Sequence, residues 1–261
     1  MPQTLTSEQY EAFDRLGVVR LPGFYPATDV GAMADRLWAD VERRFGILRE
    51  RPDSWRPASP AQFQALVRGG AFDALGSSTM VALADALLGA GAWDPPAHWG
   101  MPLVTFPTAN WGLLRPPWHL DTGACRYLSP MPVLRAFTFL EPVRPGGGGT
   151  LYVAGSHRLA LEMDRGPDGS VLRSADIRKR LAADHPWFAR LLATPGVGYR
   201  ALMNVDALAG RRTVRLEEMT GAPGDVILMH PAVLHAPAHN ALDHPRLMVT
   251  VSAYRRGAYA D

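Results

Sequence analysis

The chain carries a histidine and an aspartate separated by one residue, His119 and Asp121, and four more histidines follow much further along, between residues 230 and 244. Side chains two positions apart on an extended strand project to the same side, so both groups can reach one metal ion. Two imidazoles and one carboxylate form the facial triad of non-haem Fe(II) oxygenases, which leaves the opposite coordination positions open. The pair therefore predicts two of three metal ligands.

The third ligand has four candidates, namely His230, His235, His239 and His244. His230 and His235 are an odd number of positions apart, so an unbroken strand would send them to opposite faces. Pro231 can interrupt that alternation, so the spacing separates the two only weakly. His239 and His244 lie in a polar turn, and we expect both to be solvated.

Arg246 follows these histidines and opens an alternating run in which Met248, Thr250 and Ser252 share its strand face. A guanidinium binds a carboxylate through two parallel hydrogen bonds better than an ammonium does, which suits the far carboxylate of a 2-oxoacid. The ordered combination of the His-x-Asp pair, a distal histidine and this arginine predicts an enzyme that uses Fe(II) and 2-oxoglutarate.

The composition of the 261-residue chain is that of an ordinary soluble globular protein, with 47% apolar and 20% charged residues. A net charge of +2 gives no reason to expect nucleic acid or a membrane surface as a partner. The single cysteine, Cys125, excludes an internal disulfide and fits a reducing compartment. The N-terminal residues lack a signal sequence, and the longest apolar run contains Asp85. We therefore expect a cytoplasmic protein.

The first hundred residues are predicted to be a helical lead-in. Thr6 and Gln9 form a capping pattern for a helix that ends near Leu16 before Gly17. The further helices expected here span 29–45, a short stretch after Ser59-Pro60, and 78–88.

Short β-rich segments separated by Gly and Pro clusters dominate the rest of the chain. They are expected at 103–106, 134–140, 151–153, 213–216, 226–229 and 247–253. Residues 159–212 interrupt the pattern with a predicted helix over 174–192 and are interpreted as an insertion, a candidate lid or interface. We predict one domain over 1–261, with a lead-in at 1–100 and barrel halves at 101–158 and 213–261. The order of motifs suits a double-stranded β-helix with flanking helices.

Four segments in this order carry a resemblance to a known family. They are 5–24, the Trp-His-Leu-Asp motif at 118–121, the Gly-rich turn and Gly-Ser-His element at 147–158, and 224–235. With them the chain resembles the phytanoyl-CoA dioxygenase (PhyH-like) family of Fe(II)/2-oxoglutarate-dependent oxygenases over most of its length. The resemblance implies a jelly-roll, cupin-like core and Fe(II), 2-oxoglutarate and O2 as cofactor and cosubstrates.

The resemblance also assigns residues. His235 becomes the third ligand beside His119 and Asp121, and Arg246 the residue that binds 2-oxoglutarate. The implied reaction is hydroxylation of an unactivated C–H bond with release of succinate and CO2. Related halogenases lack the carboxylate ligand, so Asp121 favours a hydroxylase, although desaturation, epimerisation and ring closure stay open.

Four further residues are candidate contacts of the cosubstrate or substrate: Phe137, Thr150, Thr250 and Asn110. Relatives place an aromatic side chain near the position of Phe137, and a core role competes with that interpretation. Met248 and Pro237 stand where relatives often carry hydroxyl residues. The second contact to the cosubstrate carboxylate must then come from elsewhere, with Thr150 and Thr250 as candidates.

Several alternatives stay open at this point. His157 is expected to stabilise a turn, and Arg115, Arg126 and Arg135 are interpreted as solvated, with contact to an anionic substrate as the competing view. Two other functions compete with the main prediction. One is a cupin-like metal enzyme that does not use 2-oxoglutarate, and the other is a non-catalytic binding module on the same fold. The expected partner is a small molecule, natural-product or lipid-like, and the sequence predicts no oligomeric state.

Overall fold

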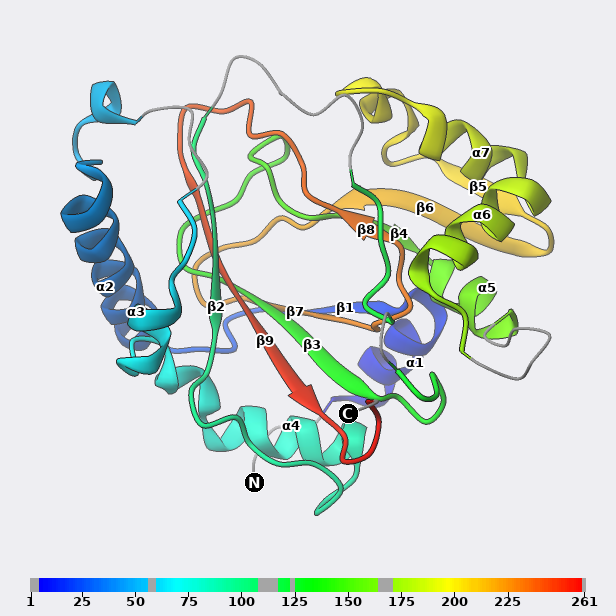
Figure 1. Cartoon of the computed structure of the whole chain (residues 1–261), viewed down its shortest axis with the longest axis horizontal. Helices are drawn as coiled ribbons and strands as arrows, with labels where there is room; N and C mark the ends of the chain where they lie inside the picture. The colour runs from blue at the N-terminus through cyan, green and yellow to red at the C-terminus, as the bar shows by residue number, and fades with distance from the viewer. Residues whose placement is uncertain (1–4, 56–59, 108–116, 123–124, 164–170, 260–261) are drawn as a thin grey trace.

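The computed structural model describes residues 5–55, 60–107, 117–122, 125–163 and 171–259. Two antiparallel sheets face each other in it (Figure 1). The first has the order β1 (Val18–Leu21), β7 (Val226–Met229), β3 (Val133–Phe139), β9 (Arg246–Tyr254) and β2 (Met101–Thr105). The second has the order β5 (Asp206–Ala209), β6 (Arg212–Glu218), β4 (Leu151–Ala154) and β8 (His235–Ala236). This arrangement confirms the predicted double-stranded β-helix.

Alternation along the strands separates an inner face from an outer face. On β9, Leu247, Val249 and Val251 join the apolar core beneath the helices, whereas Met248 joins a second cluster between the sheets. Side chains of a strand alternate between its faces, so Arg246, two residues before Met248, also points inward. The inner face of β9 therefore carries a cation into the space between the sheets.

Helices of the lead-in cover the outer face of the five-stranded sheet. They are α1 (Ser7–Leu16), α2 (Ala27–Phe45), α3 (Gln64–Arg68) and α4 (Ser78–Leu88), with short 3-10 turns at Pro52–Ser54 and Asp73–Gly76. The capping box predicted at Thr6 is confirmed, because its side chain accepts from the Gln9 amide at 3.2 Å and the Gln9 side chain accepts from the Thr6 amide. These helices match the predictions within a few residues, and α3 is the short helix expected after Ser59-Pro60.

Helices from the region predicted as an insertion cover the outer face of the four-stranded sheet. They are α5 (Ser156–Glu162), α6 (Ser174–Asp184), α7 (Pro186–Ala193) and a 3-10 turn at Gly198–Leu202. The single helix expected over 174–192 is wrong, because Pro186 begins a new helix where its missing N–H costs nothing. Residues 159–212 also contain β5, the edge strand beside β6.

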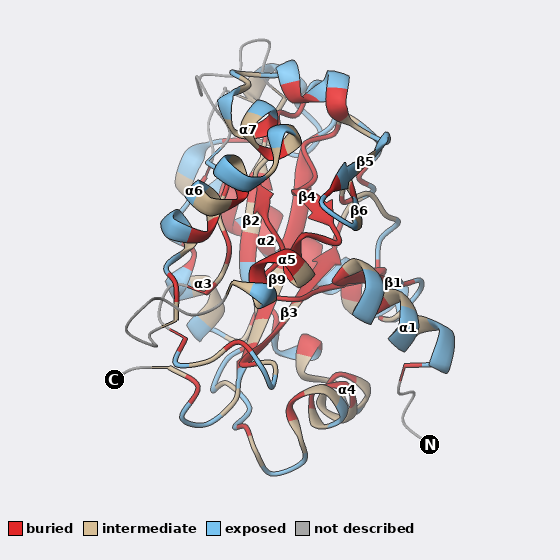
Figure 2. Cartoon of the chain, turned by 90° about the vertical axis from the view of Figure 1, so that its right-hand side faces the viewer, coloured by how far each residue is buried: buried red, intermediate tan, exposed pale blue. Residues whose placement is uncertain are grey.

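Burial follows these layers. Figure 2 shows the sheets as mostly buried, while the outward sides of α1, α6 and α7 are exposed. Among the described residues, none of the helices is both long and apolar enough to cross a membrane. The space between the sheets is therefore shielded from solvent, and a polar side chain buried there needs a hydrogen-bond partner or a ligand.

Candidate metal centre

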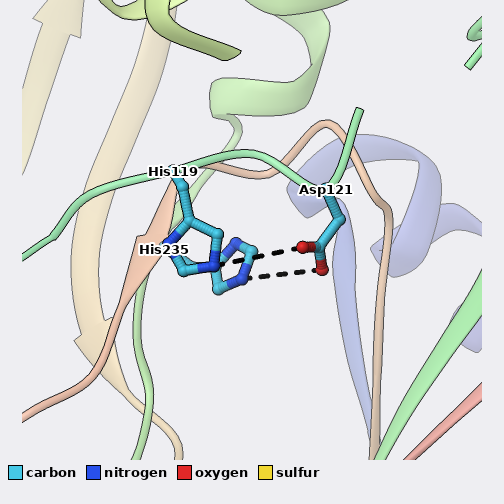
Figure 3. Close-up of side chains that lie close together, drawn as sticks. All are labelled: His119, Asp121 and His235. Carbon is cyan, nitrogen blue, oxygen red and sulfur yellow. Dashed lines mark ion pairs between the residues drawn. The ribbon is translucent and has the colours of Figure 1, made fainter. Parts of the chain in front are cut away.

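His119, Asp121 and His235 converge at one end of the interior (Figure 3). His119 Nε2 lies 4.0 Å from Asp121 Oδ1, and His235 Nε2 lies 3.6 Å from Asp121 Oδ2. One ligand atom from each residue falls within 4.8 Å of the others. Three donors at this separation can surround a single ion, as the sequence predicts.

The segment that carries His119 and Asp121 is extended without being a regular strand. Its one β-bridge joins His119 to His235, with N–O distances of 2.8 and 2.9 Å in the two directions. Trp118 and Leu120 are buried against the helices of the four-stranded sheet, so the residues between and after them point the other way. Side chains therefore alternate between the two sides of this segment as they would on a strand, because Trp118 and Leu120 are buried on one side.

Both imidazoles are oriented by backbone carbonyls. His119 Nδ1 lies 2.8 Å from the Pro117 carbonyl oxygen, and His235 Nδ1 lies 3.0 Å from that of Val233. A carbonyl only accepts hydrogen bonds, so each Nδ1 carries a proton and Nε2 is the ring nitrogen left to bind a metal ion. These are the two nitrogens that face Asp121.

Burial also keeps His235 unprotonated. Desolvation lowers the pKa of His235 well below its usual range, and the nearby Asp121 carboxylate only partly opposes that shift. A metal ion at this position therefore does not have to displace a proton from His235 at neutral pH. Two imidazoles and a carboxylate are a donor set that fits Fe(II).

Arg246 is buried without a carboxylate partner. Only 6% of the residue is exposed, and its Nη2 donates to Thr105 Oγ1 at 2.7 Å, yet among the described residues no acidic group lies within ion-pair distance. Burial lowers the pKa of Arg246 to about 10, so the guanidinium is still charged at neutral pH. A buried charge without a counter-ion is costly, so this environment fits an anionic ligand such as a 2-oxoglutarate carboxylate.

Two residues that hold Arg246 were not predicted from the sequence. Thr105 is its direct partner in the pairing of β2 with β9. The fully buried Asn240 donates through Nδ2 to the Thr105 carbonyl at 3.2 Å and to the His244 carbonyl at 2.7 Å. The contacts of Thr105 with Arg246 and with Asn240 join segments distant in sequence, and only the polar character of the 238–243 turn hinted at Asn240.

The other proposed cosubstrate contacts have different outcomes. Phe137 and Thr250 are paired across β3 and β9 on the inner face, and Thr250 Oγ1 is buried without a partner in the described part of the chain. Thr150 is buried beside the start of β4, where its carbonyl accepts from Met219. Asn110 lies outside the described residues. All four roles stay predictions.

The histidines that the metal centre does not use are mostly structural. His230 is buried, and its Nδ1 accepts from the Ala232 amide at 3.1 Å. His157 Nε2 donates to the Asp14 carbonyl at 2.9 Å, which suits its expected turn-stabilising role. His244 is exposed. The expectation that His239 is solvated is wrong, since only 7% of it is exposed and its Nδ1 lies 3.4 Å from Arg200 Nη2.

Arg135 also departs from its expected solvated position. Its Nε lies 2.9 Å from Asp121 Oδ2, so the guanidinium forms an ion pair with the metal-centre carboxylate. Arg126 is exposed, and Arg115 lies outside the described residues. The sequence could not separate these arginines, because the contact depends on the position of β3 relative to residues 117–122.

Comparison with known proteins agrees with this geometry. The sequence profile of the phytanoyl-CoA dioxygenase (PhyH) family matches residues 13–248. No curated protein sequence matches significantly.

Three solved structures illustrate the similarity of fold. The non-heme alpha ketoglutarate dependent carbocyclase SnoK from nogalamycin biosynthesis is 20% identical, with a TM-score of 0.54 over 98% of this chain and 87% of that one. HygX from Streptomyces hygroscopicus, solved with nickel and 2-oxoglutarate bound, is 17% identical, with a TM-score of 0.55 over 98% and 89%. The epimerase SnoN from nogalamycin biosynthesis is 17% identical, with a TM-score of 0.53 over 97% and 90%.

Proposed function

The chain belongs to the phytanoyl-CoA dioxygenase family, and from this premise we propose that it is an Fe(II)- and 2-oxoglutarate-dependent dioxygenase that hydroxylates an unactivated C–H bond of a small molecule. When bound, Fe(II) and 2-oxoglutarate supply the oxidising chemistry with O2, and the 2-oxoacid leaves as succinate and CO2. One observation carries the proposal: a three-residue donor set and a buried guanidinium, which has no acidic group within ion-pair distance among the described residues, both face the interior.

The metal ligands act through their orientation. The carbonyls of Pro117 and Val233 hold the two imidazoles with Nε2 toward the Asp121 carboxylate. Because the three donors come from one side, they leave adjacent coordination positions open for a chelating 2-oxoacid and for O2. In this account, His119, Asp121 and His235 bind the metal ion and take no part in proton transfer.

Arg246 orients the cosubstrate. Its guanidinium is fixed by Thr105 and points between the sheets. A carboxylate bound there would pair with a cation that is already desolvated. Charge-assisted hydrogen bonds are stronger in such an environment than in water. Thr250, whose hydroxyl is buried without a described partner, is the proposed second contact.

The same arrangement argues against the competing functions. A metal enzyme that does not use 2-oxoglutarate has no need for a buried cation on the inner face of β9, and a binding module has no need for histidines prepared as metal ligands. The carboxylate of Asp121 favours hydroxylation over halogenation. A second candidate reaction, ring closure or epimerisation of the substrate, is favoured by the similarity to SnoK and SnoN.

Turnover with candidate substrates tests the proposal. Purified protein is incubated with Fe(II), 2-oxoglutarate and a panel of small natural products and lipids, and succinate and product mass are measured. We expect substrate-stimulated succinate release and a product one oxygen atom heavier, both lost in His119→Ala. A product two hydrogens lighter would indicate ring closure or desaturation, and one of unchanged mass epimerisation; either would replace hydroxylation.

A further inference from the structure

Arg135 connects the proposed metal ligand Asp121 to the centre of the five-stranded sheet. Its Nε lies 2.9 Å from Asp121 Oδ2, and its Nη1 donates to Ser252 Oγ at 2.6 Å. Arg135 on β3 and Ser252 on β9 are direct partners in strand register. The guanidinium is therefore held by the sheet on one side and contacts the carboxylate on the other.

Among the described residues, Asp121 has few other restraints. It lies on the extended segment outside any named strand, and its amide donates to the Pro231 carbonyl at 2.9 Å. By contrast, β3 is hydrogen-bonded on both sides, to β7 and to β9. A side chain on such a strand is fixed better than one on an irregular segment. Arg135 can thus transmit the rigidity of the sheet to the Asp121 carboxylate.

The two oxygens of Asp121 have different surroundings. Oδ1 is nearest His119 Nε2, at 4.0 Å, while Oδ2 is shared between His235 Nε2 at 3.6 Å and Arg135 at 2.9 Å. A carboxylate that offers both oxygens to a metal ion occupies two coordination positions. A guanidinium paired with one of the oxygens favours binding through a single oxygen, which would keep the remaining positions of a facial triad open.

We propose that Arg135 is a positioning residue: supported by Ser252, it holds Asp121 as a ligand that uses one oxygen and so preserves the open positions that a 2-oxoacid and O2 require. This inference rests on the proposed metal site and adds a role that the sequence did not indicate. It explains why a cation lies beside a carboxylate in the half-buried centre of a metal site, where it would otherwise compete with the ion.

Metal binding without turnover provides the test. Co(II) affinity is measured by calorimetry in the wild type, Arg135→Gln, Arg135→Lys and Ser252→Ala, and water-proton relaxation of the Mn(II)-loaded proteins compares their exchangeable water ligands. Loss of a group that orients a metal ligand typically weakens binding about 10- to 100-fold. We expect a Kd increase of this size in Arg135→Gln, smaller increases in the other two variants, and lower relaxation in Arg135→Gln because Asp121 takes a second position.

Arg20→Gln is the matched control. Arg20 forms a comparable ion pair with Asp225, in which Arg20 Nη2 lies 2.5 Å from Asp225 Oδ2. Arg20 lies on β1, an edge strand of the five-stranded sheet. Its loss should lower stability and leave the Co(II) Kd unchanged. The positioning role would be overturned if folded Arg135→Gln had the Co(II) affinity and the water-proton relaxation of the wild type. If Arg135→Gln does not fold, the same result in Arg135→Lys and Ser252→Ala would overturn it. Absence of Co(II) binding in the wild type would instead overturn the metal site itself.

Discussion

Arg246 is a buried cation whose surroundings suit an anionic ligand. Burying a guanidinium without a counter-ion is unfavourable, and the described residues offer it the Thr105 hydroxyl but no carboxylate within ion-pair distance. Glu218 is the acidic group that acts on it electrostatically, yet the Glu218 carboxylate accepts from the amides of Gly146 and Gly149. The protein thus tolerates a local cost at the position where we propose that a 2-oxoglutarate carboxylate binds.

Arg246→Lys tests this at the level of one side chain. Lysine keeps the charge and loses the paired, planar donors, so at least one charge-assisted hydrogen bond worth about 1.5–3 kcal/mol is lost. We expect the Kd of 2-oxoglutarate for the Co(II)-loaded protein to rise about tenfold or more, as measured by anaerobic calorimetry. The Co(II) Kd itself should not change; unchanged 2-oxoglutarate binding would refute the assignment.

At the level of elements, the junction of α1 and β1 is tightly packed against the Gly-Ser-His segment. Gly17 ends α1 with a φ of +73°, and a Cβ there would lie 2.5 Å from His157 Nδ1 and 2.6 Å from Val233 Cγ2. Gly46 ends α2 with a φ of +64° and open space around it. The two glycines therefore differ in packing while sharing a backbone conformation.

Substituting each glycine by alanine separates these effects. Gly46→Ala should cost only the left-handed backbone strain, about 1–2 kcal/mol. Gly17→Ala adds overpacking against a buried imidazole, about 1–3 kcal/mol more. Urea unfolding measures both. Equal destabilisation would show that the α1–β1 junction is looser than described.

The same junction predicts a dependence of stability on pH. Burial lowers the pKa of His157 to about 4 and that of His230 to about 3, and their rings lie 5.3 Å apart. In the unfolded chain both histidines bind protons below a pKa of about 6.5, whereas in the folded protein they stay neutral until the pH is much lower. The free energy of unfolding therefore rises with pH between about 3 and 6.5. Above pH 6.5 the two buried histidines do not lower the free energy of unfolding. As the pH drops toward 3, their preference for the unfolded chain reduces it.

Urea midpoints between pH 7 and 4 measure this effect. His157→Gln should flatten the pH dependence relative to the wild type, whereas His244→Gln, which alters an exposed side chain, should leave it unchanged. Identical slopes in all three proteins would argue against the buried neutral pair.

The elements also show which parts of the structure a sequence can predict. The capping box of α1 and the strand at Val226–Met229 follow from local patterns, and both are confirmed. The two-residue strand β8 escaped prediction, because His235 lies in it through pairing with β4 and with the distant His119. Thr105 was missed as a site residue for the same reason, since Arg246 lies far along the chain. Arg135 was missed because its contact with Asp121 depends on how β3 packs against residues 117–122.

At the level of the whole molecule, the two sheets bring together segments that the sequence separates widely. His119, His235 and Arg246 come from an extended segment, from the four-stranded sheet and from the five-stranded sheet respectively. Catalytic competence therefore depends on closure of the double-stranded β-helix. Two assignments stay predictions: one domain over 1–261, and an insertion over 159–212 that forms a lid or an interface. Helices α6 and α7 of this region lie over the four-stranded sheet (Figure 1).

Anaerobic absorption spectroscopy tests the central claim most directly. Fe(II) is added to the metal-free protein without O2, and 2-oxoglutarate is then titrated while the visible spectrum is recorded. Chelation of Fe(II) by a 2-oxoacid produces a metal-to-ligand charge-transfer band, which we predict to saturate at one equivalent in the wild type and to be absent in His119→Ala. A wild-type protein that binds Fe(II) and develops no band with 2-oxoglutarate would contradict the proposed function.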